Sequence, residues 1–167
     1  MNVKTTVAAR WKGITLTVLV LAAAALATVL YVGDYRPARH TDPAAQQMVL
    51  DAASAATVAV LSYAPETLDR DLERARTLMA GDFLTYYGKF SAEVVAPAVR
   101  DKGIKANAQV LNSGLTEMTP TTAKVLMFLN QETVSRDRPE PALTASTVVV
   151  TLDKVDGNWL IAALDPV

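Results

Sequence analysis

The chain has 167 residues, which is enough for one domain of ordinary size and a short additional segment. Hydrophobic residues make up 51% of it, aromatic residues only 6%, and the formal net charge is −1. This balance argues against a nucleic-acid partner, because phosphate binding depends on clustered lysine and arginine. The lack of cysteine excludes disulfides, thiolate catalysis and cysteine-ligated zinc, and the single histidine, His40, excludes a histidine-rich metal site.

The first part of the chain has the pattern of a membrane anchor. Residues 14–32 contain no charged side chain, and as a helix they would span roughly 30 Å, the thickness of the hydrocarbon core of a bilayer. Trp11 before this stretch and Tyr31 at its end are suited to the headgroup level. We therefore predict a short N-terminus at residues 1–12 and a transmembrane helix at residues 13–33.

The charges beside this segment predict its orientation. Residues 1–12 hold three basic side chains and no acidic one, whereas two basic residues follow the segment before residue 41. This bias is typical of a single-pass protein of the cell (inner) membrane with a cytoplasmic N-terminus and an extracytoplasmic C-terminal domain. A cleaved signal peptide is the alternative, because residues 25–27 read Ala-Leu-Ala. Apolar character continues through residues 28–32, which favours a retained anchor.

After a linker at residues 34–41, the sequence predicts a first helix that begins at Thr41-Asp42-Pro43 and ends near Tyr63, before Pro65. Asp42 would cap it, with proline in the first turn. Its apolar positions follow the helical period: Ala45, Met48, Val49, Ala52, Ala56, Ala59, Val60 and Tyr63.

Two further helices are expected at residues 67–80 and 82–101, separated by Gly81, with Asp82 as the cap of the second. Pro97 predicts a kink or a break inside the last helix. The candidate core residues of this helix are Phe83, Tyr87, Val94, Val95 and Val99.

The remainder is rich in β-branched residues and predicts four strands, at residues 105–113, 121–134, 143–153 and 158–164. Turns are expected at Asn112-Ser113-Gly114, with Thr119-Pro120, at residues 136–141 and at Asp156-Gly157, the last a two-residue hairpin signal. Residues 121–129 and 146–152 are apolar on both faces, which indicates central strands. Residues 42–167 therefore predict an α+β domain of the NTF2-like or cystatin-like type, with helices packed on a curved four-strand antiparallel sheet. The pattern leaves open whether its interior is filled or hollow.

Few residues suggest chemistry. Asp82 and Tyr86 share a helix face and form the best acid–base pair, but a capping and packing role is the simpler interpretation because no second acid or histidine accompanies them. Trp159 has the properties of either a core residue or part of a lipid pocket. Asp69 and Glu73 have the spacing for a shared cation, although interleaved arginines favour a solvated helix face. We assign no catalytic, cofactor-binding or metal-binding residue.

Several short motifs, in this order, resemble those of the Mce-associated membrane proteins of actinobacteria. They are Tyr63, residues 67–72, Arg74-Ala75, Gly81-Asp82-Phe83, residues 91–97, Asn130-Gln131, Asp137-Arg138-Pro139, Asp156-Gly157 and Trp159-Leu160-Ile161. The likeness covers about residues 45–167, and the preceding anchor has the layout of the family.

The resemblance implies a non-catalytic accessory or stabilising subunit of an Mce-type lipid or sterol import complex. The implied partners are Mce proteins and their permease, in addition to membrane lipid around the anchor. The family has no established catalytic residues, so it adds none and implies no cofactor. Two alternatives remain at this point: a membrane-tethered lipid carrier with an apolar, cone-shaped cavity, and an NTF2-like enzyme that uses Asp82 or Tyr86.

Overall fold

A computed structural model describes residues 42–167, in which a run of helices is followed by four strands. The predicted transmembrane helix and His40 lie outside the described residues. The helical part comprises α3 (Pro43–Leu61), α4 (Leu68–Arg76), α5 (Gly81–Phe90), the short π-helix η2 (Ser91–Val95) and α6 (Ala96–Lys102). The strands are β1 (Lys105–Met118), β2 (Thr122–Val134), β3 (Ala142–Val155) and β4 (Asn158–Pro166).

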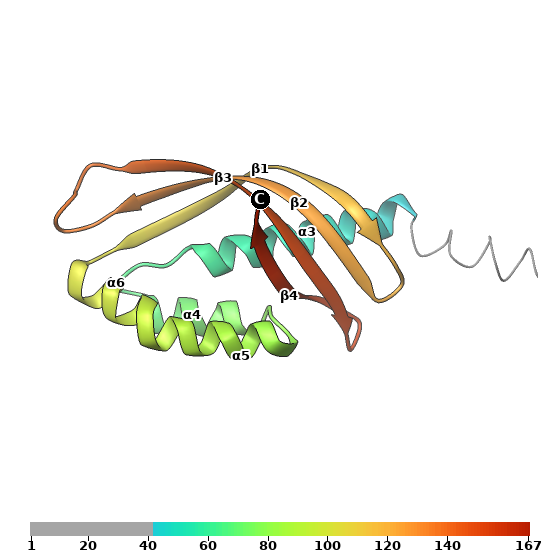
Figure 1. The fold of residues 1–167 in the computed structure, drawn as a ribbon, viewed down its shortest axis with the longest axis horizontal. Coiled ribbons are helices and arrows are strands. Elements are labelled where there is room, and N and C mark those ends of the chain that lie inside the picture. Colours follow the sequence, from blue (N-terminus) through green and yellow to red (C-terminus); the bar gives the residue numbers. More distant parts are fainter. Residues whose placement is uncertain (1–41) are drawn as a thin grey trace, which may run out of the picture. The chain divides into compact units, whose positions relative to one another are not determined.

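The four strands form one antiparallel sheet in the order β1-β2-β3-β4. The helices cover one face of the curved sheet and leave the other face open (Figure 1). The fold class and the central positions of β2 and β3 are therefore confirmed. Only the helix-facing side of β2 and β3 is buried, although their sequences are apolar on both faces: Phe128, on the open face, is 46% exposed.

Helix α3 lies directly against the sheet and contacts all four strands. Its start is as predicted, because Asp42 Oδ1 accepts a hydrogen bond from the Ala45 backbone nitrogen at 2.6 Å and Pro43 opens the first turn. The buried face agrees with the predicted one at Val49, Ala56 and Val60, whereas Met48 is 59% exposed. The face that packs on the sheet consists of Val49, Ala53, Ala56, Thr57 and Val60.

Within residues 42–167, α3 is also the helix that is long and apolar enough to cross a membrane, judged by length and composition. Its contacts with every strand identify it as the core helix of this domain. It is distinct from the predicted anchor at residues 13–33.

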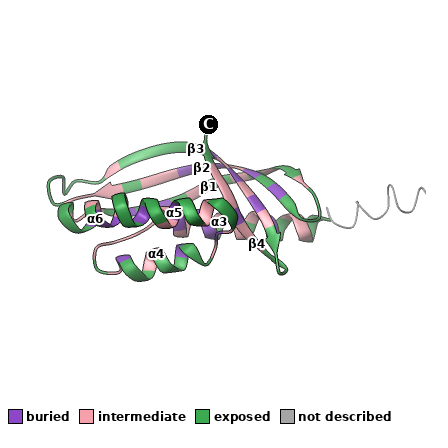
Figure 2. Cartoon of the chain, turned by 60° about the horizontal axis from the view of Figure 1, so that its bottom comes forward, coloured by how far each residue is buried: buried purple, intermediate pink, exposed green. Residues whose placement is uncertain are grey.

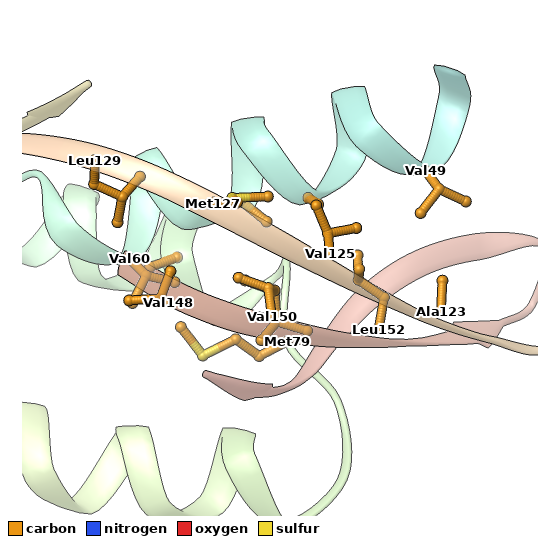
Figure 3. Close-up of a cluster of buried hydrophobic side chains, with 14 of the residues drawn as sticks. Val49, Val60, Met79, Ala123, Val125, Met127, Leu129, Val148, Val150 and Leu152 are labelled. Atoms are coloured by element: carbon orange, nitrogen blue, oxygen red, sulfur yellow. The ribbon is translucent and has the colours of Figure 1, made fainter. Parts of the chain in front are cut away.

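The interior of the domain is filled by side chains (Figure 3). Inward-facing residues of β2 and β3 alternate with outward ones, and Met127, Val150 and Leu152 have no exposed surface. Ile161 of β4 is equally buried. These side chains meet the small residues of α3, which allow the helix to approach the sheet closely. The question of a hollow or a filled cone is therefore answered by a packed core.

The predicted long third helix is interrupted, as Pro97 suggested. The π-helical turn η2 separates α5 from α6, and Pro97 lies in the first turn of α6. Pro97 has no backbone N–H and so cannot make the usual helical hydrogen bond to the carbonyl oxygen four residues earlier. An interruption of the helix at this point therefore loses no further hydrogen bond. The extra residue of the π-turn changes the helical phase, and Val94 is 50% exposed rather than buried.

The predicted cap of this helix is wrong. Ala80 is the capping residue, and Gly81 begins α5 with a φ of 59°, which leaves Asp82 as an exposed residue of the first turn. Only glycine adopts this left-handed conformation without strain, so the glycine rather than the aspartate determines where α5 begins.

Of the turns expected between the strands, the last is confirmed and the first is wrong. Asp156 and Gly157 have φ values of 50° and 86° and join the paired residues Val155 and Asn158, which confirms the two-residue hairpin. The turn expected at residues 112–114 is wrong, because β1 continues to Met118. Irregularities at residues 110–112 and 115–117 keep it paired with β2.

Thr57 allows a test of the core. It is fully buried, and its Oγ1 is a buried side-chain atom without a hydrogen-bond partner among residues 42–167. Replacing Thr57 by the similarly shaped valine should raise the free energy of unfolding by about 1 kcal/mol. Folding of the parent strips water from the Thr57 hydroxyl without giving it a hydrogen bond, and valine has no hydroxyl that bears this cost. Urea titration measures the change. A Thr57→Val variant less stable than the parent would mean that the hydroxyl is satisfied, for example by a buried water.

Candidate functional site

The feature of the domain best suited to binding is a cavity of about 210 Å³ between α5, the end of α3 and the sheet. We call it the aromatic groove. It is lined by Val60, Leu61, Tyr63, Phe83, Tyr86, Tyr87, Phe90, Val95, Gln131 and Leu164. Five of the ten aromatic residues of the chain are in this set, and none of the lining side chains is a carboxylate, lysine or arginine. Such a concentration in a chain poor in aromatic residues marks the groove as a candidate site.

Helix α5 supplies four of the five aromatic rings. Positions 83, 86, 87 and 90 lie on one helix face, because they are spaced by three or four residues. The rings of Tyr86 and Phe90 are stacked, with centroids 5.8 Å apart and an angle of 8° between the planes, and the ring of Phe83 lies 6.4 Å from that of Tyr87.

The outer part of this helix face remains exposed. Tyr86 is 62% exposed, Phe90 40% and Val94, one turn further along in η2, 50%. We call these three residues the apolar ridge. Figure 2 shows that much of the outward side of α5 is exposed. The ridge borders the groove, since Tyr86 and Phe90 belong to both.

The polar groups of the groove are neutral. Burial, together with the nearby Tyr63, raises the pKa of Tyr87 to about 12, and burial also raises the pKa of Tyr63. Gln131 Nε2 donates a hydrogen bond to the Leu61 carbonyl oxygen at 3.4 Å, which leaves the amide oxygen of Gln131 as an acceptor. The groove therefore offers tyrosine hydroxyls and an amide in an otherwise apolar setting.

The raised pKa of Tyr87 predicts how stability depends on pH. An acid whose pKa is raised by folding leaves stability unchanged below its unfolded value near 10.0. Stability is then lost as the pH rises from about 10 towards 12. Urea titrations at pH 8 and pH 11 should therefore show a smaller alkaline loss for Tyr87→Phe than for the parent. Equal losses in the two proteins would contradict the assignment.

The structure does not bring the predicted acid–base pair into one cavity. Tyr86 lines the aromatic groove, whereas Asp82 is exposed and lies outside it. Trp159 is a core residue rather than part of a pocket: it packs against the main cluster, and Lys154 Nζ lies 5.4 Å from its ring centroid. This packing favours the core interpretation of Trp159 over the lipid pocket.

The charged side chains of α4 behave as a solvated face. Asp69 Oδ1 accepts a hydrogen bond from Arg100 Nη2 at 2.7 Å, and both side chains are largely exposed. Within the described part of the chain, no group of three acidic or histidine side chains could hold a metal ion. A second, polar cleft of about 440 Å³ lies beside α4 and β1, where Arg74 and Lys105 accompany Asp71 and Glu132.

The sequence interpretation missed the groove, although it contained a signal. The aromatic residues of α5 repeat at the spacing of one helix face, which by itself predicts a core-facing side of the helix. Periodicity identifies a shared face but not what covers it. Here Tyr87 is buried while Tyr86, its neighbour in the sequence, is exposed.

The domain has an α+β fold in which helices cover one face of a four-strand antiparallel sheet. It is similar to an IcmL-like type IV secretion system protein from Legionella pneumophila, with a TM-score of 0.62, 14% identity and coverage of 75% of this chain and 92% of that one. The VirB8 protein of Agrobacterium tumefaciens gives a TM-score of 0.56 at 14% identity, with 73% and 92% covered. At these identities the likeness concerns the fold alone.

Sequence relatives identify the family. The chain is 49% identical over 138 residues to the uncharacterized protein Rv1362c of Mycobacterium tuberculosis, covering 83% of this chain and 63% of the relative. It is 42% identical over 117 residues to the outer membrane protein Rv1973 of the same organism, covering 70% and 72%. The chain therefore belongs to the family of these mycobacterial proteins. It spans just under two thirds of the length of the first relative, and no family model matches it.

Proposed function

We propose that the protein is a non-catalytic accessory subunit of an Mce-type lipid or sterol import complex. In this proposal residues 14–32 anchor it in the cell membrane, the N-terminus is cytoplasmic, and the α+β domain lies outside. Mce proteins and the permease are its partners. The observation that carries the proposal is the apolar ridge, which lies exposed on a domain whose own core is already filled.

The ridge has the composition of a protein interface. Single exposed apolar side chains are common on any surface, but adjacent ones of this size mark interaction sites. Tyrosine and phenylalanine are enriched at interface centres. Because Tyr86 and Phe90 are already stacked, little side-chain entropy is lost when a partner covers them.

Tethering makes a small interface sufficient. A domain held at a fixed height above the membrane meets a neighbouring membrane complex at high effective concentration. A patch of three apolar residues with modest intrinsic affinity then supports stable association. The proposed anchor and the proposed docking surface are thus two parts of one mechanism.

Two further observations support the proposal. Structures with this fold include proteins named as type IV secretion system components, which are parts of multiprotein assemblies. The Mce assignment itself depends on the motif resemblance. Three of the motif residues have local roles in the fold: Gly81 and Gly157 adopt positive φ, and Ser91 Oγ donates a hydrogen bond to the Gly88 carbonyl oxygen at 3.1 Å.

The alternative of a carrier with a hollow cone has less support. Its cavity would occupy the space that Met127, Leu152 and Ile161 fill, each with no exposed surface. The name of the relative Rv1973 also raises the question of which membrane holds this chain. A charge-free segment of about 20 apolar residues is suited to a helix that spans the inner membrane, and we propose that location.

The identity of the partner is tested by purification of the full chain in mild detergent through a C-terminal tag, followed by mass spectrometry. The tag does not disturb the core, because Val167 is 81% exposed. We expect Mce proteins and the permease to be recovered at levels above those of an unrelated single-pass protein with the same tag. A monomer that carries only bound lipid would contradict the subunit role and favour a carrier.

A further inference from the structure

The aromatic groove combines an apolar wall with a small number of neutral polar groups. Tyr87 is only 7% exposed, and it lines the groove together with Tyr63 and Gln131. The amide oxygen of Gln131 is available, since only its nitrogen donates to Leu61. A few hydrogen-bonding groups set in a mostly apolar concave surface are typical of a site that binds a small ligand.

We propose that the aromatic groove is a binding site for a neutral amphiphile, in which an alkyl chain segment packs among the aromatic rings and an adjoining hydroxyl or ester group hydrogen-bonds Tyr87 and Gln131. Nothing in this inference requires a partner protein, so it goes beyond the proposed subunit role and stands independently of it.

The lining determines the charge of the ligand. A carboxylate or an ammonium group placed in the groove would lose its hydration and meet no opposite charge, because none of the lining side chains is ionised near pH 7. A hydroxyl or ester loses less hydration and recovers hydrogen bonds from the phenols and the amide. The groove therefore discriminates against charged amphiphiles of equal chain length.

The volume determines how much of the ligand enters. An engineered apolar cavity of about 150 Å³ binds benzene, so 210 Å³ admits one ring or a short chain segment and not a whole lipid. The remainder of the ligand would stay outside, where the exposed rings of Tyr86 and Phe90 extend the apolar surface beyond the mouth.

The test uses the full chain in lipid nanodiscs and a photoreactive 1-octanoylglycerol with a diazirine near the end of its chain. We expect labelling of peptides that contain α5 and the end of α3. Unlabelled octanoylglycerol should compete at least about tenfold better than octanoate or octyltrimethylammonium at pH 7.5, because the charged headgroups are excluded.

Matched variants identify the site. Phe90→Ala, which removes a lining ring, should weaken competition by about tenfold. Val94→Ala lies four residues further on, is similarly exposed and does not line the groove, so it should change competition by less than about twofold. Tyr87→Phe should reduce the preference for the neutral probe and leave chain packing in place. Equal competition by all three amphiphiles, or equal effects of Phe90→Ala and Val94→Ala, would overturn the proposal in favour of non-specific partitioning.

Discussion

Replacing Leu152 by alanine should lower the free energy of unfolding by about 3 kcal/mol. Leu152 has no exposed surface and belongs to the cluster between the sheet and α3. Truncation removes its buried methyl groups and leaves a cavity, because the paired neighbours Ala123 and Ile161 are held in place by the strand ladders. Urea or thermal unfolding of the purified full chain measures the change.

Leu143 provides the matched control, because it is the same residue type on the same strand and is 74% exposed. Leu143→Ala should change stability by less than about 0.5 kcal/mol. If the two variants lost similar stability, the packing of β3 against α3 would be wrong, and with it the conclusion that the interior is filled rather than hollow.

A charge on the apolar ridge should abolish association with the transporter. Phe90→Asp and Val94→Asp should each reduce the recovery of the co-purifying Mce proteins at least about tenfold, because a desolvated, unpaired carboxylate at an interface costs more than 1.4 kcal/mol. The two positions are 40% and 50% exposed, so the new charge remains in water in the free protein and the fold is preserved.

Met48→Asp is the control for this experiment. Met48 is 59% exposed on α3 and does not belong to the ridge, so the variant should keep normal recovery. Comparison of Val94→Asp with Phe90→Asp also separates the two proposals, since Val94 lies outside the aromatic groove. Unchanged recovery with both ridge variants would show that another surface makes the contact.

Local sequence signals, such as helix caps and turn residues, predicted much of the fold. The Asp42-Pro43 start, the interruption at Pro97 and the Asp156-Gly157 hairpin each depend on the chemistry of one or two residues, and the structure contains all three. Apolar residues on both faces predict central strands, and β2 and β3 are central, although only their helix-facing side is buried and Phe128 on the other side is 46% exposed. These features need little information from distant parts of the chain.

Features that depend on tertiary contacts were predicted less well. Helix α3 is rich in alanine and apolar on most of its faces, so the sequence alone did not show that Ala53 and Thr57 would face the sheet and Met48 the solvent. Ser113 and Gly114 resembled a turn, yet β1 continues through them because its pairing with β2 satisfies the backbone.

The candidate site was missed for the same physical reason. The aromatic groove combines residues of α5 with Tyr63 after α3, Gln131 of β2 and Leu164 of β4, which are far apart in the sequence. Helical spacing placed the rings of α5 on one face. Whether that face would be covered depended on how α5 packs against β4, which no local pattern records.

The partner-binding role requires that residues 14–32 remain in the lipid. Intact-mass measurement of the tagged protein, after separation of membrane and soluble fractions, tests this requirement most directly. We predict a polypeptide that retains residues 13–33 and is found in the inner-membrane fraction. A mature polypeptide that begins near Thr28 and is recovered in the soluble fraction would contradict the tether, and with it the proposed function.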